Sequence, residues 1–171
     1  GVRTYQPSGI WEAVGYTSSN TAKFQQDHGE ALYRRSLYTF WKRTAPPPYL
    51  STFDAPSREK YCTRRERTDT PLQALVTMND PAHIEFAQGL AKRMKAHSAN
   101  PGEQLSFGVL LATQQPADPG VLKELTALLE DLKTGYAGNP AESAKLGATP
   151  EEAALVLVAN TILNLDSALN R

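Results

Sequence analysis

The chain has 171 residues and a mass of 18.7 kDa, which suits one domain, or one large domain that lacks an end. Eighteen Lys and Arg balance eighteen Asp and Glu, so no net charge indicates a dedicated nucleic-acid binder or a membrane-surface protein. No stretch approaches the ~20 apolar residues of a membrane helix, so we expect no membrane insertion. The single cysteine, Cys62, rules out an internal disulfide, a zinc site built from cysteines and a CxxCH haem attachment.

The start of the chain carries no targeting signal. The first residue is Gly1, and no basic and apolar leader precedes Tyr5. We expect either that a leader has been removed or that the chain is a piece of a longer protein.

The sequence divides into two portions of different character. Eleven of the fourteen aromatic residues lie at or before Tyr61, and the first eighty residues carry 11 basic and 8 acidic side chains. The remainder is rich in Ala and Leu and mildly acidic. We therefore expect a single domain over 1–171, with an irregular, aromatic and basic portion over 1–69 and a helical portion over 70–171.

In the first portion, residues 36–41 (SLYTFW) are rich in strand formers and are interpreted as a strand, although a buried helix would fit as well. Pro46–Pro48 predicts an extended, polyproline-like run. Residues 54–57 resemble a turn. We expect this portion to be long and irregular, with at most a short β element.

The second portion predicts four to six helices from their start signals. Thr70-Pro71 and Thr149-Pro150 begin capping boxes, and Asp80-Pro81, Asp118-Pro119 and Asn139-Pro140 place a proline at the first helical position. Residues 100–102 are expected to end one helix, and a short apolar helix over 105–111 follows and is closed at 114–116. Three apolar stripes are expected to form the core: Ile84, Ala87, Ala91 and Met94; Leu122, Leu125, Leu129 and Leu132; Leu155, Val158, Ile162 and Leu165. The predicted fold is mainly α, with the irregular portion packed on this bundle.

The densest polar cluster runs over residues 58–70 and holds five basic and three acidic side chains. Its arginines could bind a phosphate, sulfate or carboxylate beside the start of a helix, which makes Arg58, Arg64, Arg65 and Arg67 candidate ligand-binding residues. In the alternative, the arginines pair with Glu59, Glu66, Asp69 and main-chain carbonyls and hold an irregular loop in place.

The candidate catalytic residues are Asp27, His28 and Glu30. A histidine beside a carboxylate could act as a general base or join a metal site. In the alternative, His28 forms a hydrogen bond in a turn at Gly29. His83 and His97 have no obvious partner, and no further carboxylates can be placed for a metal, so we expect none.

Cys62 lies beside cationic residues that would lower the pKa of a nucleophilic thiol, but no histidine at a fixed spacing supports this role, and a small buried thiol is the preferred interpretation. Of the aromatic residues, Trp11, Tyr16 and Trp41 could stack on sugar rings, while most of the eleven must be core. Phosphate-loop, dinucleotide-binding, GxSxG and HExxH motifs are absent.

Two groups of motifs carry a family resemblance. The first comprises Tyr5-Gln6-Pro7, Gly9-Ile10-Trp11-Glu12, Gln26 to Glu30, Leu32 to Arg43 and Pro46–Pro48, and the second Phe53 to Glu59, Arg64 to Thr68, Thr70 to Leu75 and Asn79-Asp80-Pro81. They resemble a domain of unknown function abundant in planctomycete bacteria, and the resemblance closes with Asn164-Leu165-Asp166. Where relatives tend to have a Gly-Arg-x-Pro turn, this chain has residues 113–116 (TQQP).

The resemblance implies where the domain occurs and which domains accompany it, but no specific activity. Such domains typically form the C-terminal part of large exported proteins with a c-type cytochrome module upstream, and this chain resembles the last two-thirds of the domain. It implies a periplasmic or cell-surface location, the upstream domains as partners and a haem outside this chain, with no cofactor within it.

Two functions of different class follow. In the first, the chain is a non-catalytic scaffold or interaction domain beside a cytochrome. In the second, it binds or cleaves a polysaccharide through Asp27, His28 and Glu30, and the arginines hold an acidic or sulfated sugar. Docking of a redox partner through the basic portion is a third possibility, and we expect no nucleic-acid partner.

Overall fold

The computed structural model describes residues 1–170 and is mainly helical, with no sheet among them. The expectation of a mainly α chain with at most a short β element is confirmed. The chain forms two compact units, residues 1–73 and the residues from Ala74 onward. We call them the N-terminal unit and the helical unit, and each is described by itself.

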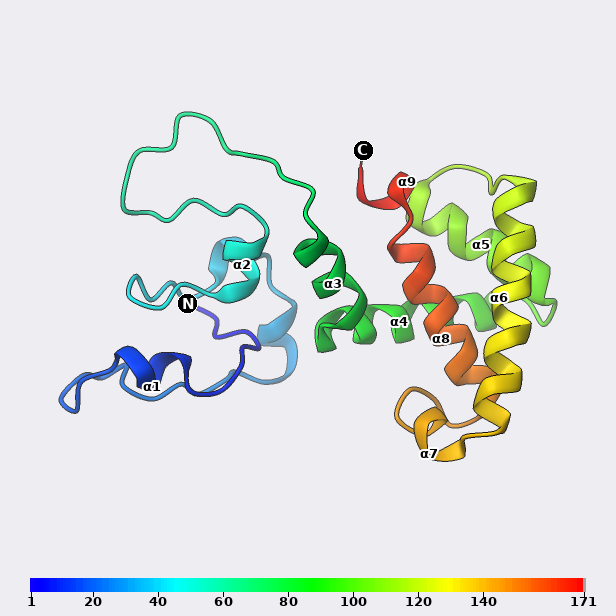
Figure 1. Cartoon of the computed structure of the whole chain (residues 1–171), viewed down its shortest axis with the longest axis horizontal. Coiled ribbons are helices and arrows are strands. Elements are labelled where there is room, and N and C mark those ends of the chain that lie inside the picture. Colours follow the sequence, from blue (N-terminus) through cyan, green and yellow to red (C-terminus); the bar gives the residue numbers. More distant parts are fainter. Residues whose placement is uncertain (171) are drawn as a thin grey trace. The chain divides into compact units, whose positions relative to one another are not determined.

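The N-terminal unit contains four short helical segments joined by long irregular stretches (Figure 1). They are α1 (Ile10–Val14), the 3-10 helices η1 (Gly29–Tyr33) and η2 (Ser36–Tyr38), and α2 (Pro48–Thr52). Helix α3 (Pro71–Asn79) begins at the end of this unit.

The strand expected over 36–41 is wrong, because this stretch contains η2 and only one isolated parallel β-bridge, from Thr39 to Val2. The Val2 N–H donates to Tyr38 O at 2.7 Å, and the Phe40 N–H donates to Val2 O at 2.7 Å. A strand needs a neighbour along its whole length. Here the neighbour is one residue long, so the backbone closes local bonds instead, such as Tyr38 N–H to Arg35 O at 2.9 Å.

The polyproline run is shorter than expected. Pro47 is extended, with φ −57° and ψ 120°, but Pro48 already begins α2. A proline at the first helical position is tolerated because that N–H has no helical partner. After α2 the chain turns sharply at Asp54, whose φ is +57°, and the Ala55 N–H donates to Leu50 O.

Trp11 is the centre of the small core of the N-terminal unit and is 2% exposed. Its ring lies edge-on to Phe24 at 5.2 Å between centroids and tilted against Phe40 at 5.5 Å. The Lys42 ammonium lies 4.9 Å from the indole centroid and donates to Thr21 O at 2.7 Å. One lysine thus stacks on the core ring by a cation–π contact and ties two chain segments together.

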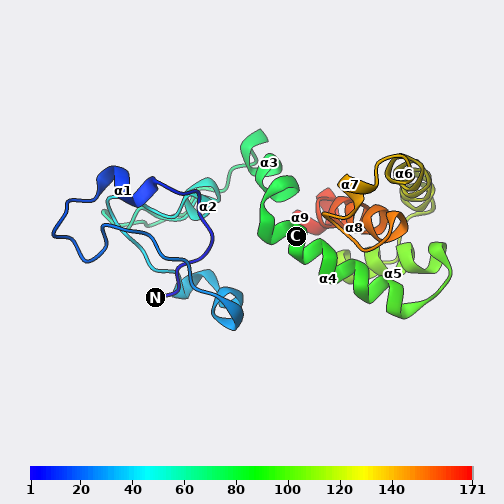
Figure 2. The same ribbon diagram turned by 90° about the horizontal axis from the view of Figure 1, so that it is seen from below.

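The helical unit holds the long helices (Figures 1 and 2). It also contains most of the buried apolar side chains. From the end of α3 the helices follow as α4 (Pro81–His97), α5 (Pro101–Thr113), α6 (Pro119–Ala137), α7 (Pro140–Ser143), α8 (Pro150–Leu163) and α9 (Asp166–Leu169). The predicted starts of α3, α4, α6, α7 and α8 are confirmed. The helix predicted over 105–111 is confirmed, but α5 begins earlier than expected: Asn100 caps its start, since its Oδ1 accepts the Gly102 N–H at 2.8 Å.

Helix α8 is central to the helical unit and packs against both α4 and α6. The hydrophobic core contains members of all three predicted stripes, among them Met94, Leu129 and Ile162. Met94 and Ile162 are fully buried. A polar contact adds to this packing, because the Asn160 side chain, on α8, donates to Met78 O at 2.9 Å and so holds the end of α3.

Candidate functional site

The candidate catalytic residues Asp27, His28 and Glu30 do not form a hydrogen-bonded group. Asp27 is engaged with the backbone of Arg3, because its Oδ2 accepts the Arg3 N–H at 2.9 Å and its own N–H donates to Arg3 O at 3.0 Å. His28 and Glu30 are exposed at the start of η1. Among residues 1–170, no hydrogen bond or ion pair joins the three side chains, and no group of three or more His, Cys, Asp or Glu could hold a metal ion.

The arginine cluster lies on one long exposed loop. We call residues 55–67 the arginine loop; from Ser57 to Asp69 every residue is exposed. The loop lies between α2 and α3 and is drawn as the wide excursion in cyan and green (Figure 1). It has no helix of its own, so what fixes its two ends determines where the arginines lie.

Three polar side chains join the two ends of the loop, and we call Asp54, Thr68 and Gln73 the base clamp. Asp54 Oδ2 accepts the Thr68 N–H at 2.8 Å and the Thr68 hydroxyl at 2.9 Å. Gln73 is 7% exposed, and its Nε2 donates to Thr68 Oγ1 at 3.0 Å and to Thr52 O at 2.9 Å. The clamp thus connects the end of α2, the end of the loop and the first turn of α3.

The capping box at α3 belongs to the same network. The Gln73 N–H donates to Thr70 Oγ1 at 3.3 Å, and Gln73 Oε1 accepts the Thr70 N–H at 2.9 Å. This is the reciprocal pair that the sequence predicts. Sequence reasoning found the cap but missed the second role of Gln73, whose amide donors reach Thr52 and Thr68.

The clamp also affects the acidity of Asp54. Hydrogen bonds from the Thr68 backbone and hydroxyl lower the pKa of the Asp54 carboxyl, and Gln73 and the positive charge of Arg65 add to the effect. Hydrogen bonds to a carboxylate favour its charged form. The clamp is therefore made by ionised Asp54.

Where the loop meets the base clamp, an open hollow is lined by Arg64, Arg65, Glu66, Arg67 and Thr68. None of the ion pairs among residues 1–170 includes an arginine. The alternative in which the arginines pair with Glu59, Glu66 and Asp69 therefore has no ion pair to support it in the described chain. Guanidinium groups that form no ion pair can donate paired hydrogen bonds to an oxyanion.

Arg58 and Trp41 form a pair of their own. The guanidinium carbon of Arg58 lies 4.9 Å from the centroid of the half-buried Trp41 ring. The backbone of Arg58 is left-handed, with φ +63°. Arg58 and Trp41 are not among the residues that line the hollow, whereas Arg64, Arg65 and Arg67 are.

The expectation of a buried thiol at Cys62 is wrong, because Cys62 is exposed. Its Sγ donates to Arg64 O at 3.4 Å. A small apolar side chain is buried where a core is within reach, and the arginine loop offers none. Among the aromatic candidates for sugar stacking, Trp11 is core, whereas Tyr16 is 69% exposed.

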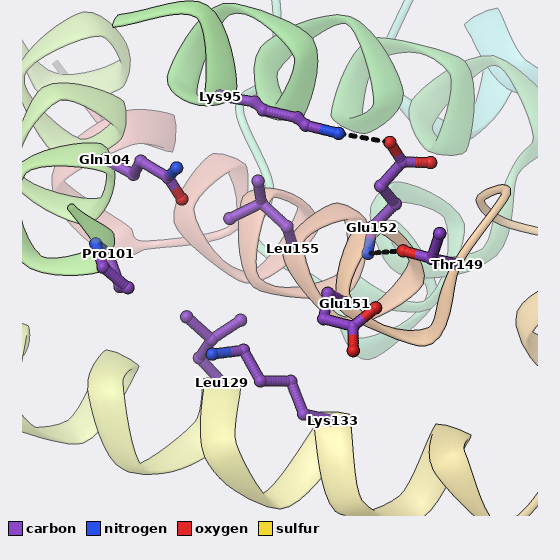
Figure 3. A pocket seen from close by; sticks show the side chains of 9 residues that line it. All are labelled: Lys95, Pro101, Gln104, Leu129, Lys133, Thr149, Glu151, Glu152 and Leu155. Atoms are coloured by element: carbon purple, nitrogen blue, oxygen red, sulfur yellow. Dashed lines mark hydrogen bonds and ion pairs between the residues drawn. The ribbon is translucent and has the colours of Figure 1, made fainter. Parts of the chain in front are cut away.

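The helical unit contains a pocket of about 210 Å³ that the sequence analysis did not find (Figure 3). We call it the helical pocket; α4, α5, α6 and α8 supply most of its lining, which comprises Lys95, Pro101, Gln104, Leu129, Lys133, Thr149, Glu151, Glu152 and Leu155. Lys95 pairs with Glu152 at its rim. The capping box at Thr149 is visible in the sequence, but the pocket arises only when four helices pack together.

The family comparison gives the chain its place among known proteins. Residues 1–129 match the model of the PSD1 family, described as a protein of unknown function (DUF1553). The chain belongs to this family. The match ends before Asn164-Leu165-Asp166, with which the resemblance was expected to close. No curated protein and no solved structure matches the chain significantly.

Proposed function

We propose that this PSD1-family chain is a non-catalytic interaction domain, and that its arginine loop binds anionic groups of an acidic polysaccharide. The observation that carries the proposal is the open hollow formed by Arg64, Arg65 and Arg67, which are exposed and have no ion pair among residues 1–170. A carboxylate is planar and a sulfate group is tetrahedral, but each presents two oxygens on one centre that can accept paired hydrogen bonds from the guanidinium fork.

The base clamp supports this proposal. A long loop that must be ordered on binding costs free energy, and a loop whose ends are already joined needs less ordering. Asp54 and Gln73 hold the end of the loop at Thr68, next to Arg67. Three arginines close together on one exposed loop suit the repeating negative charges of a linear polymer.

The contacts of Asp27 support an interaction role over a cleaving role. A general base must be free to accept a proton from substrate or water. The Asp27 carboxylate is instead held by the Arg3 backbone, which places it in the structure of the N-terminal segment. We therefore do not propose polysaccharide cleavage.

The setting belongs to the proposal as well. We propose that the domain works in an exported protein of the periplasm or cell surface, beside a haem-bearing module, as the resemblance of its motifs implies. There the loop would attach the protein to an acidic extracellular polymer. Among residues 1–170, no helix is long and apolar enough to cross a membrane.

The test compares heparin, a sulfated polysaccharide, with neutral dextran by isothermal titration calorimetry. We expect binding to heparin alone, with an affinity that falls steeply as salt is added. The triple variant Arg64→Gln, Arg65→Gln, Arg67→Gln should bind at least about tenfold more weakly.

A matched control removes the same charge from the helical unit. The variant Lys92→Gln, Arg93→Gln, Lys123→Gln replaces three exposed cations outside the loop. It should bind heparin within about twofold of the unchanged chain. Equal loss in both triple variants, with both folded by circular dichroism, would show attraction to net charge alone and contradict the proposal.

A further inference from the structure

The floor of the helical pocket is aliphatic. Leu129 and Leu155 are 2% and 6% exposed and are part of the hydrophobic core. Pro101, at the start of α5, adds a third apolar surface. No aromatic ring is among the described lining residues, so the surface on which sugar rings stack is missing there. An aliphatic group is the complement of this floor.

The rim of the pocket carries both signs of charge. Lys133 extends from α6 beside Leu129, and Glu151 lies at the start of α8 (Figure 3). Hydrogen bonds from its own backbone and from Thr149 lower the pKa of the Glu151 carboxyl, and the charge of Lys133 adds to this, so the two groups interact. An ion pair, Lys95 with Glu152, lies on the same rim.

Lys133 and Glu151 both keep hydrogen-bonding capacity. Lys133 Nζ donates to Glu130 Oε1 at 2.7 Å, which uses one of the three ammonium donors. The Glu151 carboxylate has about four acceptor positions, and Thr149 engages it. A ligand can therefore add a carboxylate on the Lys133 side and an ammonium on the Glu151 side while the existing contacts remain.

We propose that the helical pocket binds a free α-amino acid with an aliphatic side chain. In this assignment Lys133 donates to the ligand carboxylate, Glu151 accepts from its ammonium, and Leu129 and Leu155 contact its side chain. The volume fits, because about 210 Å³ exceeds the ~150 Å³ of an engineered cavity that holds benzene. It lies below the ~300 Å³ at which sites for drug-sized ligands begin.

The experiment is a nuclear magnetic resonance titration of the labelled chain with L-leucine. We expect saturable amide shifts around the pocket, with a dissociation constant between about 0.1 and 1 mM, as suits a small ligand in an open site. Glycine, which lacks the side chain, should bind at least about tenfold more weakly, because the burial of several methyl and methylene groups is lost.

Two blocked ligands separate the free amino acid from a peptide terminus. N-acetyl-L-leucine keeps the carboxylate and lacks the ammonium, as a peptide C-terminus does, and L-leucinamide keeps the ammonium and lacks the carboxylate. Each should bind at least about tenfold more weakly than L-leucine, because one charge-assisted contact is lost. Equal binding of either blocked ligand would contradict the zwitterion assignment.

Variants test the two roles. Lys133→Met should weaken L-leucine binding at least about tenfold, and Glu151→Gln should do the same while changing N-acetyl-L-leucine binding by less than about twofold. Lys145→Met is the matched control, because Lys145 pairs with Glu142 at the same spacing and distance but does not line the pocket. An unchanged affinity in Lys133→Met, or no saturable shift at about ten times the expected dissociation constant, would overturn the proposal.

Discussion

The two units of this chain are stabilised in different ways. In the helical unit, apolar side chains of several helices are buried around α8. In the N-terminal unit, the buried apolar residues are Trp11, Ala45 and Pro47. There, side chains such as Asp27, Lys42 and Gln73 bind the backbone of distant segments.

This difference explains where each candidate site lies. A loop without regular structure must satisfy its backbone through side chains or water. In the N-terminal unit, the base clamp satisfies backbone groups next to the two ends of the arginine loop. The loop itself is left exposed to solvent. In the helical unit, the packed helices leave a small pocket with an aliphatic floor and a charged rim.

The largest effect is expected from removing the one large core residue of the N-terminal unit. Trp11→Ala should destabilise this unit by about 3–5 kcal/mol, since the indole fills the space between Phe24 and Phe40. Both tryptophans lie in this unit, so fluorescence of Trp41 should report its unfolding, while far-ultraviolet circular dichroism retains the helices of the other unit. Simultaneous loss of both signals would show that the two units unfold as one, and Tyr16→Ala is the exposed control.

The counterpart in the helical unit is Met94→Ala. Met94 is fully buried within the hydrophobic core, so its truncation should cost about 2–5 kcal/mol. Urea unfolding followed by circular dichroism measures the change. Tryptophan fluorescence should report the same midpoint as in the unchanged chain, and Leu110→Ala, at an exposed position, should cost less than about 1 kcal/mol.

An intermediate effect is expected at the base clamp. Gln73→Ala removes the donors to Thr52 O and Thr68 Oγ1 and the acceptor for the Thr70 N–H, at a cost of about 1–3 kcal/mol. Trypsin should then cleave the arginine loop faster. The control Gln115→Ala replaces an exposed glutamine outside the clamp, and an equal cleavage rate in both variants would contradict the role given to Gln73.

The smallest expected effect is a dependence of the stability of the fold on pH. Because the clamp lowers the pKa of Asp54 relative to the unfolded chain, ionised Asp54 stabilises the fold above the unfolded value, near pH 4. This contribution is lost as the pH falls through the folded value. The Thr68 amide should lose protection from hydrogen exchange in that range. In the Asp54→Asn variant, the Thr68 amide should be less protected from hydrogen exchange at neutral pH. Its protection should also show no loss as the pH falls through this range.

The starts of the helices are predicted well because they depend on capping residues close by in the sequence. Asp80, Asp118 and Thr149 each accept a backbone N–H in the first turn of their helix, and each is followed by proline, so the start of the helix depends on neighbouring residues only. Asn100 shows the limit of such signals. The sequence Asn-Pro-Gly can either end one helix or begin the next. The hydrogen bond from the Gly102 N–H to Asn100 shows that it begins α5.

Features that depend on distant residues could not be predicted. A strand over 36–41 requires a long partner, and the structure provides one residue, Val2. Burial of Cys62 requires a core near the arginine loop, which the sequence cannot reveal. Lys95 and Glu152 lie 57 positions apart and meet only through the packing of α4 and α8.

The central claim is that the arginine loop of the N-terminal unit is the binding element. The most direct measurement is a titration of the labelled chain with a short heparin oligosaccharide, followed residue by residue through amide shifts. We predict saturable shifts at Arg64, Arg65, Arg67 and Thr68, with the helical unit unchanged. Shifts centred on the helical unit, or no shift at a low salt concentration, would contradict the account.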